Sequence, residues 1–161
     1  MGFYGHLVAV KRHEAWELLK YLANLNLTPW ICVGDFNEAV SLSKKWGGGG
    51  RSSNQMRDFH LEQEDCDLAD LGYRGPKYTW SNYREGHAFT KERLDRGVAN
   101  SEWRDLFPKA EVFVEATANS DHAMIHIFFM GQQQVLKSRS RFRYEASWTL
   151  DRDYKAMLQN A

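Results

Sequence analysis

The chain has 161 residues, of which 43% are hydrophobic and 14% aromatic, so its composition excludes a wholly disordered protein and predicts one domain with a real core. Its 21 basic and 21 acidic residues give a formal net charge of +0, so a nucleic-acid partner would have to be held by a local patch of charge. The two cysteines, Cys32 and Cys66, form no CxxC motif and are most simply buried thiols in a reducing compartment. The N-terminus has no signal-peptide pattern, and no apolar run reaches the roughly 18 residues of a membrane span, which predicts an intracellular protein, nuclear or cytoplasmic.

The first third of the chain predicts a strand, a helix and a second strand. Residues 2–5 are typical of the end of a strand that turns sharply. From residue 10 to about residue 25, apolar side chains recur at helical spacing opposite charged ones, which predicts an amphipathic helix. Pro29 ends that helix, and the continuous apolar run 30–33 predicts a strand buried on both faces.

An insertion follows the second strand. Residues 47–50 are four consecutive glycines and predict a loop. Ser52 and Gln55 then form a capping-box pattern, which predicts the start of a second helix. The residues of this helix that we expect to face inward are Met56, Phe59 and Gln63.

The remaining elements are mostly strands. Residues 77–82 and 92–98 predict two strands joined by a loop that contains Gly86, and this hairpin places Trp80 near the block 93–96. A short helix is expected around residues 101–106. Two further strands are predicted at the end of the domain, at residues 111–116 and 123–130.

The composition changes after residue 130. A run of glutamines and then spaced basic residues predicts a linker at 131–143, and the aromatic stretch from Tyr144 onward predicts the start of a segment that continues elsewhere. We therefore divide the chain into a domain at 1–130 and a linker with the start of the following segment at 131–161.

Three polar blocks lie at the ends of predicted strands, at residues 34–37, 92–96 and 120–122. In the first block, Asp35 and Asn37 are two positions apart, so both side chains project to the same side of an extended backbone. An acid beside an amide suits proton transfer together with a hydrogen bond to water or to a phosphate oxygen.

The other two blocks complete a coherent set. Asp121 and His122 are adjacent, which allows the carboxylate to bind a hard cation such as Mg²⁺ while the imidazole faces a phosphate. Asp95 would be free to orient that imidazole by accepting its second N–H. Three acids, one amide and one histidine point to hydrolysis of a phosphodiester.

Each feature also has a plainer interpretation. The block 34–37 alone is typical of an Asx-type turn, and Asp95 between two arginines is typical of a surface ion pair. Ser120 and Asp121 could cap a turn and leave His122 as a histidine at a strand edge. Single aromatic residues such as Tyr4 and Trp80 belong to a core more often than to a site. The three blocks together, in order, favour the site.

The three blocks, in this order and with strands between them, resemble the later motifs of the endonuclease/exonuclease/phosphatase superfamily. Further stretches are similar to the endonuclease module of plant non-LTR (LINE-type) retrotransposons. These stretches are 2–6, 11–13 with Trp16, 67–72 with Gly75, 78–82 and 103–108. The tail at 142–148 resembles the segment that leads toward the reverse transcriptase in those polyproteins, so the resemblance extends over nearly the whole chain.

This resemblance implies an α/β fold, a partial four-layered α/β sandwich of the DNase-like type with a mixed, mostly antiparallel sheet and flanking helices. The first half of the superfamily's domain supplies an asparagine and a glutamate, the principal Mg²⁺ ligand, and neither is found here, so the N-terminal half is expected to be missing. If the 161 residues were the whole polypeptide, we would expect weak metal binding, exposed apolar surface and little or no nuclease activity.

The resemblance also implies roles for the residues of the three blocks. Asp35 would act as acid or base near the attacking water or the leaving group, and Asn37 would help to hold it. Asp121 would approach a metal ion, Mg²⁺ or alternatively Mn²⁺. His122 would bind the scissile phosphate or accept a proton there, with Asp95 behind it.

Three residues outside the blocks receive roles from the same resemblance. Tyr4 matches a catalytic active-site tyrosine whose phenol hydrogen-bonds the phosphate, whereas Trp80 and Asn82 would bind the substrate. Trp80 and Asn82 belong to a hairpin that lies against the DNA in such enzymes.

Two main function classes follow. The first is a Mg²⁺-dependent DNA endonuclease module that nicks a target strand and precedes a reverse transcriptase domain in a parent polyprotein. The second is a catalytically dead remnant, or interaction fragment, of such a domain. A metal-dependent phosphomonoesterase of the same superfamily ranks third, because the basic motifs that would select its substrate are not visible.

Overall fold

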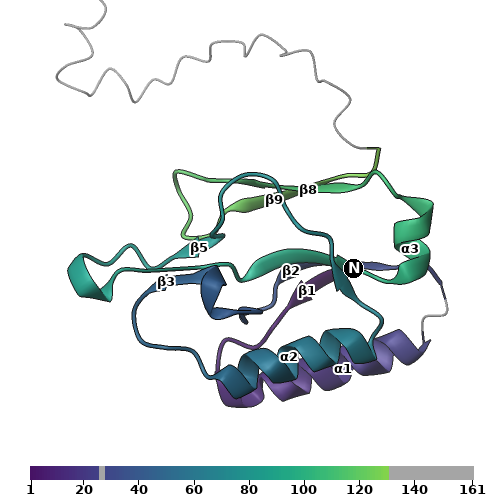
Figure 1. Cartoon of the computed structure of the whole chain (residues 1–161), viewed down its shortest axis with the longest axis horizontal. Helices are drawn as coiled ribbons and strands as arrows, with labels where there is room; N and C mark the ends of the chain where they lie inside the picture. Colours follow the sequence, from purple (N-terminus) through teal and green to yellow (C-terminus); the bar gives the residue numbers. More distant parts are fainter. Residues whose placement is uncertain (26–27, 131–161) are drawn as a thin grey trace, which may run out of the picture.

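The computed structural model describes residues 1–25 and 28–130, and the predicted linker at 131–143 and the predicted segment after it, up to residue 161, lie outside the described residues. Two long helices, a central sheet and a two-stranded sheet follow one another as layers, and a small three-stranded sheet extends one side (Figure 1). Within these ranges, no helix has the length and apolar character needed to cross a membrane.

The central sheet places the site, and its strand order is β1-β2-β7-β4. Strand β1 (Gly2–Tyr4) runs parallel to β2 (Ile31–Asp35), whereas β7 (Asp95–Ala99) is antiparallel to both β2 and β4 (Ala69–Asp70). The register pairs Tyr4 with Asp35 and Asp35 with Asp95. Three predicted site residues therefore stand side by side at one end of the sheet.

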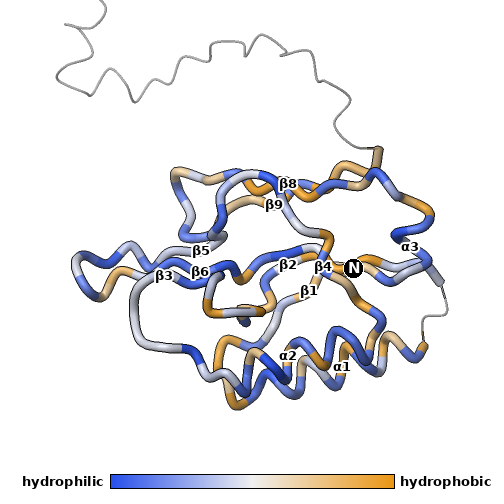
Figure 2. The backbone as a smooth tube through the Cα atoms, in the orientation of Figure 1, coloured by the Kyte–Doolittle hydropathy of each residue, from blue (hydrophilic) through white to orange (hydrophobic). Residues whose placement is uncertain are grey.

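Helices α1 (Arg12–Leu25) and α2 (Ser53–Asp65) cover one face of this sheet, and hydrophobic and hydrophilic positions alternate along both (Figure 2). Between helices and sheet lies an aromatic core of Phe3, Trp16, Phe36 and Phe59. Both cysteines are buried and free, as the sequence predicts, and burial raises the pKa of Cys32 to about 12. Helix α2 starts where expected, but Ser52 makes no capping hydrogen bond with its side chain.

The predicted hairpin is only partly correct. Strand β5 (Trp80–Ser81) pairs with β6 (Thr90–Glu92), which also pairs with β3 (Lys45–Gly47), a strand that the sequence did not predict. After Glu92 the chain leaves this sheet, and β7 joins the central one. The Thr79 hydroxyl accepts the N–H groups of Leu94 and Asp95 at this point, so a side chain takes the place of strand pairing.

The last elements cover the second face of the central sheet. Helix α3 (Ser101–Leu106) begins where the Asn100 side chain accepts the N–H of Trp103. Strands β8 (Glu111–Glu115) and β9 (Met124–Phe128) lie within the predicted ranges, pair with each other and approach β7 at Gly97. Short 3-10 turns complete the described chain, at Ala9–Lys11, Leu42–Lys44 and Gly86–Ala88.

Candidate active site

The structure brings Asp35, Asp95 and His122 together at the end of the central sheet. Asp35 ends β2 and pairs across the sheet with Asp95, the first residue of β7. His122 Nδ1 lies 2.9 Å from Asp95 Oδ2, and His122 Nε2 lies 3.9 Å from Asp35 Oδ2. One imidazole therefore stands between two carboxylates, and the hydrolytic roles expected of the three groups stay predictions.

Asn37 holds the turn that carries Asp35. Its backbone is in the left-handed region at φ 54°, which asparagine tolerates better than most residues, and its side chain is buried. The Asn37 backbone N–H donates to Asp35 Oδ1 at 2.7 Å, and its side-chain Nδ2 donates to the Gly5 carbonyl at 2.8 Å. This agrees with a supporting role for Asn37 beside the acid.

A glycine allows β1 to approach that turn closely. Gly34 has φ +150°, and a Cβ added there would lie 2.0 Å from the carbonyl oxygen of Phe3. Since Phe3 and Tyr4 belong to β1, any larger residue at position 34 would push the first strand away from Asp35.

Backbone contacts fix the imidazole and its partner. The Asp95 N–H donates to the Thr79 hydroxyl at 2.9 Å, and the Asp95 side chain is 11% exposed. The His122 carbonyl accepts the Thr117 hydroxyl at 2.8 Å, and the His122 N–H donates to Ser120 Oγ at 3.1 Å. A buried carboxylate bonded to one ring nitrogen orients the other nitrogen toward a reacting group.

Asp35 has a shifted acidity. Burial raises the pKa of its carboxyl, and the nearby charge of Asp95 acts in the same direction. The N–H of Asn37 and the charges of His122 and Arg12 oppose this rise. A carboxyl that holds its proton more tightly than usual suits a group that exchanges protons with water or a leaving group.

The variant Asp35→Asn is expected to increase the free energy of unfolding at pH 7. A carboxyl with a raised folded-state pKa favours the folded state below its ordinary pKa of about 3.9 and loses that contribution as the pH rises through the folded value. The neutral amide avoids this loss, so the difference from the parent chain should vanish near pH 3. Urea unfolding at both pH values, with EDTA present, measures it.

The matched control is Asp105→Asn, on the exposed side of α3. We expect this variant to unfold like the parent chain at both pH values. A gain for Asp35→Asn that persists unchanged at pH 3 would contradict the interpretation.

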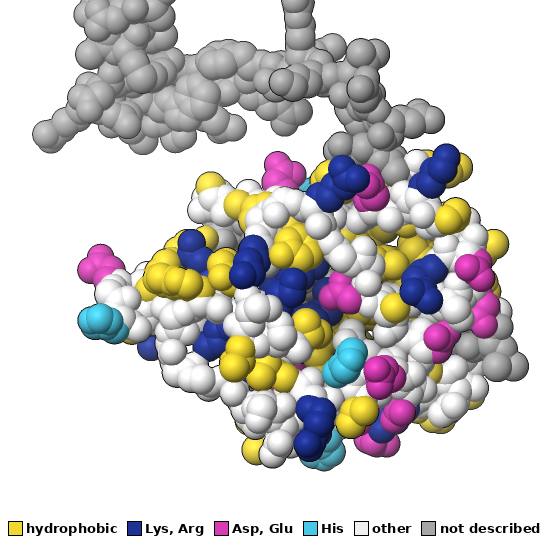
Figure 3. All heavy atoms as spheres, in the orientation of Figure 1, with side chains coloured by type: hydrophobic (Ala, Val, Ile, Leu, Met, Phe, Trp, Pro, Cys, Tyr) yellow, Lys and Arg dark blue, Asp and Glu magenta, His cyan; other side chains and the backbone are white. Residues whose placement is uncertain are grey.

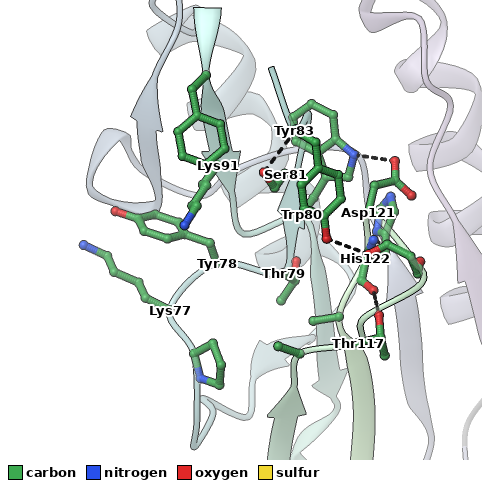
Figure 4. A pocket seen from close by; sticks show the side chains of 15 residues that line it. Lys77, Tyr78, Thr79, Trp80, Ser81, Tyr83, Lys91, Thr117, Asp121 and His122 are labelled. Atoms are coloured by element: carbon green, nitrogen blue, oxygen red, sulfur yellow. Dashed lines mark hydrogen bonds between the residues drawn. The ribbon is translucent and has the colours of Figure 1, made fainter. Parts of the chain in front are cut away.

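Asp121 lies beside the three clustered groups but does not join them. Its Oδ2 accepts the indole N–H of Trp80 at 3.0 Å, and its side chain is exposed (Figure 4). Within the described part of the chain, the ligand atoms that lie within 4.8 Å of one another belong to Asp35, Asp95 and His122. Two carboxylates with a third nearby have the oxygen chemistry that Mg²⁺ prefers, and the metal role of Asp121 stays a prediction.

The remaining predicted residues differ in their surroundings. Tyr4 is 70% exposed on the rim beside Asp35. The side-chain amide of Asn82 donates to the Ala88 carbonyl and accepts the N–H groups of Arg84 and Thr90, so it closes the loop between β5 and β6. Asn82 thus shapes the hairpin through backbone contacts.

Trp80 lines a pocket of about 260 Å³ that borders His122 (Figure 4). Most residues that line this pocket were not predicted from the sequence. The basic and aromatic residues interspersed between positions 77 and 91 could have indicated it. Lys77 Nζ lies 5.4 Å from the ring centroid of Tyr78, and Lys91 Nζ lies 5.0 Å from that of Phe89. Figure 3 shows Lys and Arg side chains among hydrophobic ones on one face of the molecule.

No protein-family model and no curated protein matches the chain. Among solved structures, it is similar to the "Endonuclease domain of TRAS1, a telomere-specific non-LTR retrotransposon", with a TM-score of 0.54 and 19% sequence identity. The protein has a DNase-like fold. This finding confirms the expected α/β class with mixed sheets and flanking helices, whereas an origin in plant elements stays a prediction. The match covers 71% of this chain and 50% of that one, so the chain spans half the length of the matched structure.

Proposed function

We propose that the chain is the phosphodiester-hydrolysing part of a Mg²⁺-dependent DNA endonuclease, derived from a plant-like LINE retrotransposon. The observation that carries this proposal is the arrangement of His122 between Asp95 and Asp35. The fold of a retrotransposon endonuclease domain supports it. In a parent polyprotein, such a module would precede a reverse transcriptase domain, and its place of action would be nuclear or cytoplasmic.

The three clustered side chains divide the reaction between them. Asp95 accepts the Nδ1 proton of His122 and so leaves Nε2 to face the substrate. Nε2 in its protonated form donates to a non-bridging phosphate oxygen and stabilises the negative charge that grows there. Asp35 takes a proton from the attacking water while the water oxygen forms its bond to phosphorus. The bond from phosphorus to the leaving oxygen breaks, and this oxygen takes up a proton from solvent.

A cation fits the surroundings of this site. Asp121 would hold Mg²⁺, or alternatively Mn²⁺, beside the cluster of Asp35, Asp95 and His122, because a carboxylate is the hard oxygen ligand that both ions prefer. When bound, the ion would neutralise charge on the phosphate.

The surroundings of the site support DNA as the substrate. The pocket beside His122 combines aromatic rings with Lys77 and Lys91, and aromatic rings with lysines are the usual contacts of bases and phosphates. Trp80 would contact a nucleotide from this pocket, and Asn82 would shape the hairpin that lies against the strand. Tyr4, beside Asp35 at the end of β1, would donate a hydrogen bond from its phenol O–H to the phosphate.

Nicking of supercoiled plasmid tests this proposal. In contrast to the little or no activity that the resemblance implies for the 161 residues alone, the proposal requires the purified chain to nick the plasmid with Mg²⁺. The activity should be lost with EDTA and should fall about 100-fold or more on Asp121→Ala, because charge neutralisation by the ion supplies several kcal/mol. Asp105→Ala, a matched change of an exposed carboxylate on α3, should leave the rate unchanged.

A catalytically dead remnant is the second candidate. It is favoured by exposed apolar side chains next to β1, where Leu7 is 69% exposed and Val10 is 75% exposed. Absence of nicking by the folded parent chain with both Mg²⁺ and Mn²⁺ would support the remnant. Release of phosphate from a small phosphomonoester without any plasmid nicking would instead support a phosphomonoesterase.

A further inference from the structure

A buried group of charges lies next to the site, and the proposed reaction does not use it. Glu38 is 1% exposed and Glu92 is 4% exposed, so both carboxylates need partners inside the protein. One guanidinium contacts both of them. Arg51 donates from Nη1 to Glu38 Oε1 at 2.8 Å and from Nε to Glu92 Oε2 at 2.6 Å.

Each of these carboxylates belongs to a segment that carries a site residue. Glu38 follows Asn37 directly, and Arg51 Nη1 also donates to the Asn37 carbonyl at 3.2 Å. Glu92 precedes Asp95 by three residues, and its carbonyl accepts the N–H of Thr79, whose hydroxyl binds the Asp95 N–H. Arg51 therefore links the turn after β2 to the sheet switch that leads into β7.

Each carboxylate also has a cation of its own. Arg12 Nη1 lies 2.5 Å from Glu38 Oε2, and Lys45 Nζ lies 2.5 Å from Glu92 Oε1. Loss of the Arg51 side chain would leave both carboxylates paired but no longer joined to each other. The protein should then still fold, because no buried charge is left without a partner.

We propose that Arg51 is a positioning residue that holds the Asp35–Asn37 turn at the correct separation from Asp95 and His122. No hydrogen bond or ion pair of Arg51 in the described structure goes to Asp35, Asp95 or His122, so it acts through Glu38 and Glu92. This inference rests on the proposed function for its effect on rate. Because small misplacements of reacting groups are costly, the expected loss of rate is about 10- to 100-fold.

The test compares Arg51→Met, Arg51→Lys and the control Arg74→Met in the full chain. Arg74 also pairs with a carboxylate: its Nη2 lies 2.5 Å from Oε1 of Glu111, the first residue of β8, away from the site. Arg51→Met should lower the maximal nicking rate 10- to 100-fold with little change in KM. Arg51→Lys keeps the positive charge but loses the planar guanidinium, whose several N–H groups reach both carboxylates. It should recover only part of the rate. Arg74→Met should match the parent chain.

Hydrogen exchange of the Asn37 amide provides a readout that needs no activity. In Arg51→Met this amide should exchange about tenfold faster than in the parent chain, while the amide of Val98, in the core of β7, changes no more than in Arg74→Met. Unchanged exchange at Asn37 would overturn the proposal whether or not the chain nicks DNA. If the parent chain nicks, an unchanged rate in Arg51→Met would overturn it too, and absence of nicking by the parent would count against the proposed function alone.

Discussion

Replacement of His122 by alanine is expected to lower the rate of plasmid nicking with Mg²⁺ by about 10²- to 10³-fold, the range for loss of one hydrogen-bond donor to an oxygen whose charge grows in the transition state. His122 is the one described side chain that contacts both Asp35 and Asp95, and alanine would leave the two carboxylates facing each other with no imidazole between them. The rate should be measured at saturating plasmid, so that weaker binding does not contribute.

His60→Ala is the matched control, because His60 is an exposed histidine on α2 that faces away from the site and pairs with Glu64. Its rate and its stability should equal those of the parent chain. A His122→Ala variant that nicks at the parent rate would remove the imidazole from the mechanism, even if Asp121→Ala is inactive.

Truncation of Phe36 to alanine is expected to lower the free energy of unfolding by about 3–5 kcal/mol, the usual cost of removing a buried phenylalanine. Phe36 is 0% exposed, and its ring centroid lies 4.7 Å from that of Phe3 and 5.6 Å from that of Phe59. It also stands between Asp35 and Asn37 in the chain, so the cavity would loosen the turn that carries both. Urea unfolding followed by circular dichroism measures the loss.

Tyr21→Ala provides the comparison for this change, because Tyr21 is an aromatic residue on α1 that is 61% exposed. Its effect should stay within about 0.5 kcal/mol, as is usual for surface positions. A similar small effect for Phe36→Ala would mean that the aromatic core does not hold the site turn.

The periodic parts of the fold could be predicted from the sequence because burial of one face leaves a repeat along the chain. The apolar spacing of α1 is such a repeat, and β2 was predicted from a continuous apolar run instead. Both elements were found close to the predicted bounds. Strands β3 and β4 have only three and two residues and leave no repeat to detect.

The switch between sheets after Glu92 has a different cause. It depends on the Thr79 hydroxyl, a single side chain thirteen positions earlier that takes up the N–H groups of Leu94 and Asp95. Local pattern carries no information on such a contact, so the sequence predicted one continuous strand from 92 to 98.

The candidate site was predictable in part for a similar reason. Asp35, Asp95 and His122 stand next to strand ends, and strand ends of one sheet meet in space, so their grouping followed from the pattern. The bond between Asp121 and Trp80, the loop-closing role of Asn82 and the two contacts of Arg51 depend on side-chain geometry across long separations. The spacing of residues along the sequence indicates none of these contacts.

The pairing of β2 with β7 has a consequence for how the protein forms. Strand β7 must find β2 across about half of the described chain, and pairings of such long separation form slowly because the intervening segment loses much conformational entropy. Until the two strands pair, the edges that will join them expose unpaired backbone N–H and C=O groups. These exposed edges make the nascent chain prone to self-association. Synthesis at low temperature or with a chaperone should therefore raise the yield of folded protein.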